Sequence, residues 1–334
     1  MTPALTDRFP QVPADRLLAA FAPPRHFAGA RFDTYLPDPE HPSQARAQER
    51  MAQVAAEVLR PTGRFRRRRP SAPAVYLDGG FGVGKTHLLA ALAHEVGPTR
   101  AAYGTFVEYT HLVGALGFAA AVRELVHRRV VCIDEFELDD PGDTVLMSRL
   151  LRELSDAGVA LAATSNTLPE SLGEGRFAAE DFLREIQALS ARFEVLRVDG
   201  PDYRHRTAPA VAAGLPDEEV RAAVAGVPGA AVEDFDALVA HLRDVHPVRY
   251  GPLLDGVALV GLTGVHPLTD QADALRLVVL VDRLYDRDVP VVLGGCGTQG
   301  LFSDAMLRGG YRKKYLRTLS RLSELAERGR PTPG

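Results

Sequence analysis

The chain has 334 residues, of which 46% are hydrophobic, and this is enough to bury a large core and to form two domains. A formal net charge of −4 argues against a surface built throughout to neutralise nucleic acid, although a local basic patch is compatible with it. The sequence has no apolar run of the about 18 residues that a membrane span needs and no secretory signal pattern, so we expect a cytoplasmic protein without a transmembrane segment.

Residues 1–70 are predicted to form an N-terminal helical extension. Two helical patterns, 14–21 and 43–59, are joined by a proline-rich segment that includes Tyr35-Leu36-Pro37-Asp38-Pro39. The extension ends in the basic run Arg64–Arg69. Such a run fits nucleic acid, anionic lipid or an acidic protein, and it fits equally a solvated linker before the first strand.

A phosphate-binding loop follows the apolar run 74–77 and precedes a helical pattern. The loop is Gly79, Gly80, Phe81, Gly82, Val83, Gly84, Lys85 and Thr86, which matches the spacing G-x-x-x-x-G-K-T. Its glycines let successive backbone N–H groups turn onto phosphates, and the helix N-terminus adds partial positive charge. We expect Lys85 to reach the β- and γ-phosphates of ATP and the Thr86 hydroxyl to hold Mg²⁺.

Residues 71–206 alternate short apolar runs with amphipathic stretches. This pattern predicts an α/β fold with a parallel sheet flanked by helices, as in a P-loop NTPase. The order of strand, phosphate-binding loop, acids and polar strand end is that of the AAA+ type. The expected strands are 75–78, 104–108, 130–133, 159–164 and 194–198. The expected helices lie near 86–95, 111–127, 143–157 and 180–191.

Polar residues follow two of these strands. Asp134 and Glu135 come directly after the apolar run 130–133. We expect Asp134 to hold Mg²⁺, directly or through water, and Glu135 to orient and deprotonate the attacking water. Taken alone, the two acids also fit an N-cap before the next helix. Asn166 follows the fourth strand, where an amide can contact the γ-phosphate and the water, although a turn-forming Ser-Asn pair is the alternative.

Several short motifs together resemble those of the ZapE family. Members of this family are AAA+ ATPases of bacterial cell division, and a mitochondrial AFG-like branch is related to them. The motifs are Cys132-Ile133-Asp134-Glu135-Phe136, Asp140, Asp143, Ala163-Thr164-Ser165-Asn166 and Asp202-Tyr203-Arg204-His205-Arg206. The likeness is strongest over residues 70–206. It implies ATP-dependent action on the tubulin-like protein FtsZ or another division-ring protein. The segment 103–111 departs from the His-Phe-rich second strand of the family.

AAA+ proteins hydrolyse ATP at subunit interfaces, where an arginine of a neighbouring subunit stabilises the transferred phosphoryl group. We therefore expect a homo-oligomeric ring. Arg176, Arg184 and Arg192 are the candidates for this arginine, with Arg176 first because it lies in a predicted loop; each also fits a solvated face.

Residues 207–334 are predicted to form a smaller, mainly helical C-terminal lid. Helical patterns at 218–224, 235–244, 272–286 and 311–327 enclose the apolar runs 257–262 and 289–293. In AAA+ proteins a lid arginine contacts the γ-phosphate. Arg321 is our candidate, with Arg317 one turn earlier as the second choice, and a solvent-facing arginine is the alternative.

Three functions remain open on this pattern. The first is a ring ATPase that remodels a division protein, as the resemblance implies. The second is an ATP-dependent nucleic-acid factor such as a helicase loader, which the run Arg64–Arg69 and the segment 105–109 fit. The third is a nucleotide-gated scaffold without catalysis. Glu135 argues against the scaffold, because a scaffold does not need a water-activating carboxylate.

Overall fold

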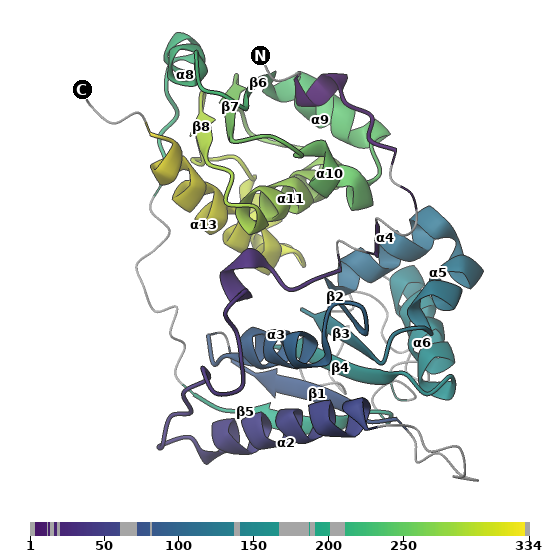
Figure 1. Cartoon of the computed structure of the whole chain (residues 1–334). Helices are drawn as coiled ribbons and strands as arrows, with labels where there is room; N and C mark the ends of the chain where they lie inside the picture. The colour runs from purple at the N-terminus through teal and green to yellow at the C-terminus, as the bar shows by residue number, and fades with distance from the viewer. Residues whose placement is uncertain are drawn as a thin grey trace. The chain divides into compact units, whose positions relative to one another are not determined.

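The computed structural model describes residues 4–11, 13, 17–18, 21–60, 72–80, 82–136, 141–166, 187, 191–200 and 211–330. The chain divides into two compact units. The central unit comprises Ala14–Arg206, and the C-terminal unit comprises Thr207–Gly334 together with Met1–Pro13 (Figure 1). The segment 1–70, expected as one extension, is therefore divided between the units.

The central unit is built on a five-stranded sheet whose strands are all parallel. They are β1 (Ala74–Gly79), β2 (Ala101–Thr105), β3 (Val130–Asp134), β4 (Ala160–Ser165) and β5 (Glu194–Val198), in the order β2-β3-β4-β1-β5. Parallel strands need crossover connections and cover on both faces, so the three inner strands read as continuous apolar runs. The predicted parallel sheet flanked by helices is confirmed.

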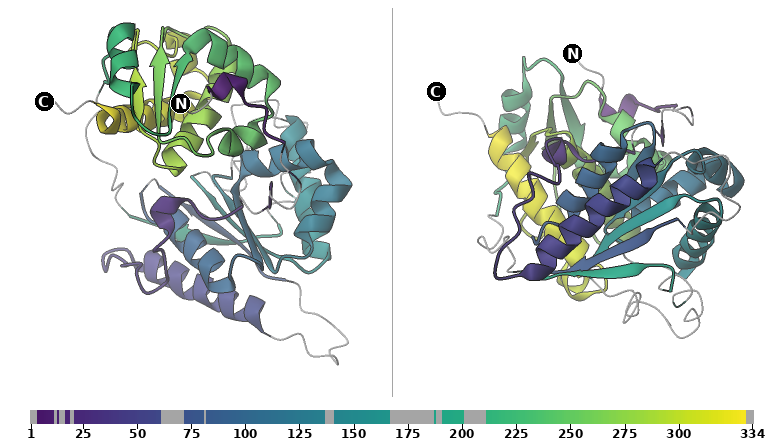
Figure 2. Two further views of the ribbon diagram at one scale, coloured as in Figure 1. Left: turned by 45° about the horizontal axis from the view of Figure 1, so that its top comes forward. Right: turned by 60° about the horizontal axis from the view of Figure 1, so that its bottom comes forward.

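Helices cover both faces of this sheet. They are α2 (Pro42–Leu59), α3 (Lys85–Val96), α4 (Phe106–Leu116), α5 (Phe118–Leu125) and α6 (Pro141–Asp156). Figure 2 shows α2 and α3 over one face, and α6 packs on β4 from the other. In α2 the buried residues Ala47, Met51, Val54 and Val58 recur every three or four positions, which is the spacing of one helix face.

The prediction for the second strand and its following helix was wrong at their junction. The strand ends at Thr105 and α4 begins at Phe106, five residues before the predicted helix. The cause is a capping box: Glu108 N donates to Thr105 Oγ1 over 3.3 Å, and Thr105 N donates to Glu108 Oε2 over 2.6 Å. Gly117, with φ of 81°, then separates α4 from α5.

The C-terminal unit surrounds a second parallel sheet with helices. Its strands are β6 (Ala230–Asp234), β7 (Leu259–Thr263) and β8 (Val291–Leu293), in that order across the sheet. Its helices are α8 (Asp217–Val224), α9 (Phe235–Asp244), α10 (Tyr250–Leu253), α11 (Gln271–Asp286), α12 (Asp304–Arg308) and α13 (Arg312–Gly329). The helical patterns and both apolar runs were recognised in the sequence, whereas β6 and the sheet itself were not. Of the helices in the described part of the chain, none is long and apolar enough to span a membrane.

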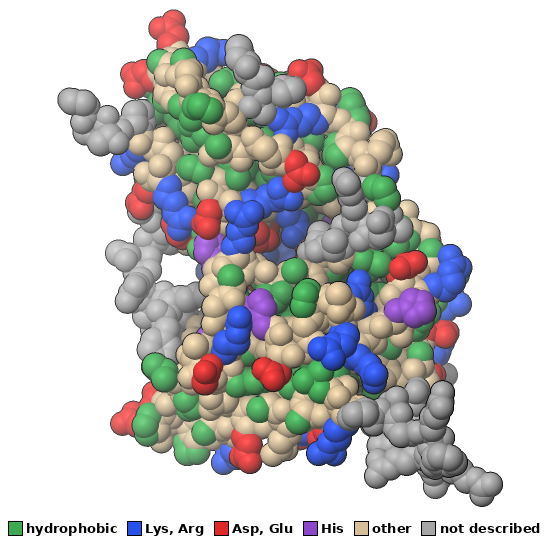
Figure 3. Space-filling view, viewed as in Figure 1, with side chains coloured by type: hydrophobic (Ala, Val, Ile, Leu, Met, Phe, Trp, Pro, Cys, Tyr) green, Lys and Arg blue, Asp and Glu red, His purple; other side chains and the backbone are tan. Residues whose placement is uncertain are grey.

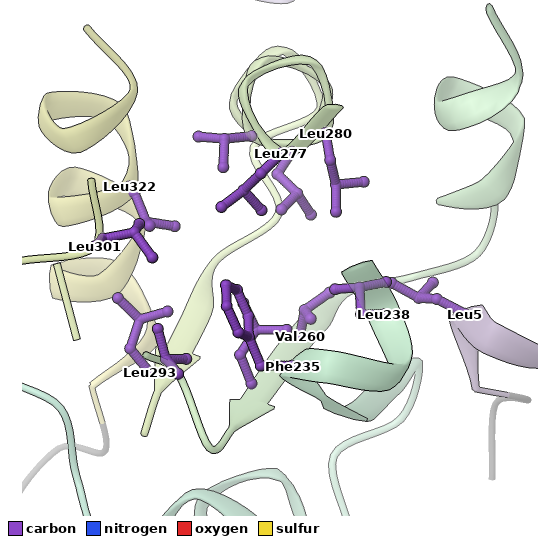
Figure 4. Close-up of a pocket in the computed structure, with 13 residues that line it drawn as sticks. Leu5, Phe235, Leu238, Val260, Leu277, Leu280, Leu293, Leu301 and Leu322 are labelled. Atoms are coloured by element: carbon purple, nitrogen blue, oxygen red, sulfur yellow. The ribbon is translucent and has the colours of Figure 1, made fainter. Parts of the chain in front are cut away.

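Leu5, near the start of the chain, is part of the C-terminal unit's core. Leu5 is fully buried and lines a cavity of about 10 Å³ together with Phe235 and Leu238, with Leu238 beside it (Figure 4). This volume holds no more than about one water, so the cavity is a packing gap and not a ligand site. The backbone N–H of Leu5 donates to the carboxylate of buried Glu233, and the Thr6 hydroxyl donates to the same group over 3.1 Å. Burial raises the pKa of Glu233, and these donors oppose that rise.

We expect Leu5→Ala to destabilise the C-terminal unit by about 2–5 kcal/mol, because a buried leucine is replaced by a cavity. Thermal melting, with hydrogen exchange of the peptides that contain β6 and β7, measures the effect and its location. Leu36→Ala is the control, since Leu36 is 86% exposed and should change stability by less than about 0.5 kcal/mol. Unchanged exchange in β6 and β7 contradicts the packing role of Leu5.

Candidate nucleotide-binding site

The loop between β1 and α3 has the glycines that its geometry requires. A Cβ atom at Gly79 would lie 2.1 Å from the carbonyl oxygen of Val198. Gly84 caps α3 with φ of 90°, and a Cβ atom there would lie 2.4 Å from the ring of Tyr35. Both positions therefore exclude any larger residue. Phe81 lies outside the described residues.

Lys85 is the first residue of α3 and is only 7% exposed. Its Nζ donates to the carbonyl oxygens of Gly79 over 2.8 Å and Gly80 over 2.5 Å, and to Asn166 Oδ1 over 2.9 Å. The ammonium group thus connects the loop to the end of β4. The two residues expected to contact the γ-phosphate lie in direct contact with each other.

Asp134 ends β3 and is 6% exposed. Its Oδ1 accepts from Thr86 Oγ1 over 3.3 Å and also from the hydroxyl of Thr164. Its Oδ2 accepts from the hydroxyl of Tyr103 over 2.7 Å. Burial, and then the charge of Glu135, raise the pKa of Asp134, while the hydrogen bonds oppose that rise. A buried carboxylate of this kind is strongly stabilised by a cation beside it.

The contact between Thr86 and Asp134 fits Mg²⁺. Hydroxyl and carboxylate oxygens are the hard ligands this ion prefers, and it takes its remaining ligands from waters and substrate phosphates. Among the described residues no group of three His, Cys, Asp or Glu side chains forms a metal cluster. Mg²⁺ bound with a nucleotide does not need such a cluster, so these two side chains are the residues that would hold it.

Glu135 has an unusual backbone conformation. Its φ is 52°, in the left-handed region that non-glycine residues rarely occupy. The conformation is held on both sides: its N–H donates to Asp134 Oδ1 and to Thr164 Oγ1, each over 3.1 Å, and Phe136 N donates to Thr164 O over 2.7 Å. Phe136 is fully buried against other aromatic rings. Strain maintained in this way is typical of functional sites.

The other predicted residues differ in what the structure says of them. Arg192 forms an ion pair of 3.5 Å with Asp156 of its own chain. Arg176 and Arg184 lie outside the described residues, as do Asp202–Arg206. Their roles stay predictions.

Arg317 and Arg321 both lie in the C-terminal unit and share one partner. Arg317 donates to Asp282 Oδ2 over 3.0 Å, and Arg321 donates to Asp282 Oδ1 over 2.5 Å. Burial alone would raise the pKa of Asp282, but the two guanidinium groups outweigh it and lower the pKa. Arg321 also lies 5.0 Å from the ring centre of Tyr285. A role for either arginine at a γ-phosphate stays a prediction.

Three residues of this site were not identified from the sequence. Tyr103 and Thr164 donate to Asp134 from the strands on either side of β3. Tyr35 donates from its hydroxyl to the carbonyl oxygen of Val83 in the loop, over 2.9 Å. Thr164 lies in a predicted strand, whereas Tyr103 lies one residue before the predicted strand 104–108, and the strand register that brings both side chains to Asp134 could not be read from the sequence.

We expect Tyr35→Phe to weaken ATP binding about two- to tenfold, because the loop carbonyl at Val83 loses its donor. Equilibrium titration with a fluorescent ATP analogue measures the change. Leu36→Ala is the matched control, since this neighbouring side chain is highly exposed. Equal affinity in the Tyr35→Phe and wild-type proteins contradicts a role of Tyr35 in holding the loop.

Comparison with known proteins adds the family. A model of the AFG1-like ATPase family matches residues 11–227 and 213–329, which together make up most of the chain. The chain belongs to the AFG1-like ATPase family. The resemblance inferred from the sequence motifs is confirmed at this level.

Two curated relatives match part of this chain. The cell division protein ZapE of Escherichia coli K12 is 32% identical over 144 residues, which are 40% of this chain and 38% of that protein. An uncharacterised protein of Schizosaccharomyces pombe is 30% identical over 153 residues, which are 40% of this chain and 34% of that protein. The chain thus spans little more than a third of the length of these curated relatives.

Two solved structures are similar to this chain at lower sequence identity. Domain III of the replication initiation protein DnaA from Thermotoga maritima is 19% identical, with a TM-score of 0.40 over 52% of this chain and 69% of that one. The DnaC helicase loader is 17% identical, with a TM-score of 0.36 over 52% of this chain and 99% of that one.

Proposed function

We propose that this AFG1-like chain binds ATP together with Mg²⁺ at the loop Gly79–Thr86 and hydrolyses it. The observation that carries the proposal is the meeting of two pairs at one sheet edge: Lys85 with Asn166, and Thr86 with Asp134. Lys85 and Thr86 begin α3 after the loop that follows β1, Asp134 ends β3, and Asn166 follows β4. The carboxyl ends of these parallel strands are where ligands of open α/β sheets bind. Family membership supports the same activity.

Each residue has a role in this proposal. Lys85 binds the β- and γ-phosphates, and Thr86 and Asp134 hold Mg²⁺, which neutralises phosphate charge. Glu135 accepts the proton of the attacking water. The two hydrogen bonds of its backbone N–H hold the position from which its side chain extends. Asn166 accepts a hydrogen bond from Lys85 at its amide oxygen, and its N–H₂ group can donate to the γ-phosphate.

A homo-oligomeric ring and a division-ring partner complete the proposal. The ring supplies the arginine in trans, for which Arg176 is the first candidate and Arg184 the next. Arg192 is the weakest candidate, since it is already paired with Asp156.

For the partner we propose FtsZ or another division-ring protein, supported by the relative that is named a cell division protein. A cytoplasmic location follows from such a partner.

Co-sedimentation of the Glu135→Gln protein with FtsZ polymers tests the partner. The expected result is recovery in the polymer pellet with ATP but not with ADP, unchanged by a single-stranded DNA competitor. Glu124→Gln, on an exposed helical position of α5, is the matched control for a lost carboxylate. ATP-dependent binding to DNA without recovery on FtsZ overturns the division partner and favours a helicase-loader function.

The second candidate, an ATP-dependent nucleic-acid factor, rests on the run Arg64–Arg69, which lies outside the described residues. On the face of the central unit seen in Figure 3, acidic and basic side chains lie among one another. A nucleic-acid site predicts binding that falls steeply with salt through the arginine run, so binding at rising salt distinguishes the two functions.

A further inference from the structure

Tyr103 is a buried phenol with one charged partner. Its side chain is 3% exposed, and its hydroxyl donates to Asp134 Oδ2 over 2.7 Å. The register of β2 and β3 explains the contact: Thr105 is paired with Asp134, and Tyr103 lies two residues earlier on the same face of the sheet.

The two oxygens of Asp134 have different partners. Oδ1 accepts from Thr86, Thr164 and the backbone N–H of Glu135. Oδ2 accepts from Tyr103, on the opposite side of the carboxylate. A donor on each oxygen fixes the plane of the carboxylate about the Cβ–Cγ bond. The hydrogen bond from Tyr103 therefore opposes a tilt of this plane and keeps the other oxygen beside the Thr86 hydroxyl.

We propose that Tyr103 is a positioning residue for magnesium: its hydroxyl fixes the orientation in which Asp134 and Thr86 together bind the ion. The inference rests on the proposed function, because it requires that nucleotide and Mg²⁺ bind at this loop. Residues that hydrogen-bond a metal ligand without binding the metal themselves typically contribute about 10- to 100-fold to metal affinity. Tyr103 lies in such a place beside Asp134 Oδ2.

The chain offers a matched control in Tyr109. It is also a fully buried tyrosine that packs against the sheet, although on the face opposite to Tyr103, beside Gly104. Its hydroxyl donates to the backbone carbonyls of Ala102 and Cys132 over 3.1 and 3.2 Å. Tyr109→Phe therefore removes a buried hydroxyl close to β3 without touching Asp134. Any general effect of a lost buried hydroxyl appears in both variants.

The test measures the affinity of the full chain for a fluorescent, non-hydrolysable ATP analogue, in excess Mg²⁺ and in EDTA. We expect Tyr103→Phe to reduce the gain in affinity that Mg²⁺ provides by about tenfold, with the affinity in EDTA unchanged. Tyr109→Phe should leave the gain as in the wild type. The Mg²⁺ concentration for half-maximal phosphate release should rise by the same factor in Tyr103→Phe, with little change in turnover at saturating Mg²⁺.

A double-mutant cycle with Asp134→Asn shows whether Tyr103 acts through Asp134. In that background Tyr103→Phe should cause no further decrease in the affinity gain that Mg²⁺ provides.

An unchanged affinity gain in Tyr103→Phe, or an equal decrease in Tyr109→Phe, overturns the inference. A wild-type chain that binds no nucleotide overturns the proposed function itself, whereas nucleotide binding with an unaltered Mg²⁺ gain in the variant overturns only the role of Tyr103. Circular dichroism of each variant, together with its nucleotide affinity in EDTA, distinguishes misfolding from loss of the ion.

Discussion

Replacing Glu135 by glutamine is expected to slow phosphate release from ATP by about 10²- to 10⁴-fold, with ATP affinity within about threefold of the wild type. Glutamine has the shape of glutamate but cannot accept the proton of the attacking water. The backbone of residue 135 is held at φ of 52° by the two hydrogen bonds of its N–H and by buried Phe136, so the side chain starts from the same place in both proteins. The substitution should therefore remove the proton acceptor and leave the position of the side chain unchanged.

Phosphate release under saturating ATP and Mg²⁺, together with equilibrium binding of ATP, separates the two effects. Glu124→Gln should leave both unchanged, because this exposed glutamate of α5 lies away from the loop. Turnover within a factor of about ten of the wild type would remove Glu135 from the water-activating role. If in addition the variant kept full cellular activity, a nucleotide-gated scaffold would become the better account.

The site was predictable where its signals are local. The loop Gly79–Thr86 is a contiguous motif, and Asp134 and Asn166 follow strands that are buried on both faces. Such strands read as continuous apolar runs, and the polar residue after each run marks a carboxyl end. Because the carboxyl ends of parallel strands meet at one edge, the order of these residues in the sequence was enough to predict that they lie close together.

Contacts between distant segments were not predictable. Tyr103 reaches Asp134 only because β2 pairs with β3 in one register, and a shift of one residue would turn its side chain to the other face. Tyr35 contacts Val83 from a segment almost fifty positions earlier, and Leu5 and Glu233 are 228 positions apart. Nothing in the neighbouring residues of either partner specifies these pairs.

The strand β6 was missed for a different reason. Its sequence, Ala230-Ala231-Val232-Glu233-Asp234, contains one β-branched residue and two acids, which is the composition of a loop or a helix start. The acid at position 233 is nevertheless buried, because the backbone N–H groups of Leu5 and Thr6 hydrogen-bond its carboxylate. A tertiary contact thus overrides the local preference.

Replacing Lys85 by alanine is expected to weaken ATP binding by about 10- to 100-fold, which corresponds to the loss of one or two charge-assisted hydrogen bonds to phosphate. The residue has a second role in the structure: its ammonium group joins the carbonyl oxygens of Gly79 and Gly80 to Asn166. Alanine removes this connection, so the loop and the end of β4 are held together less firmly. We therefore expect turnover to fall even when ATP is raised to saturation.

Titration with ATP and measurement of phosphate release over a wide range of ATP concentrations separate the two losses. Lys85→Arg keeps the charge but replaces a compact ammonium with a planar guanidinium, and it should restore little in the confined position that Lys85 occupies. Lys314→Ala, in α13 of the C-terminal unit, is the control for a lost lysine charge. An affinity in Lys85→Ala within twofold of the wild type would show that the nucleotide phosphates do not bind at this loop, and the proposed ATPase site would have to be abandoned.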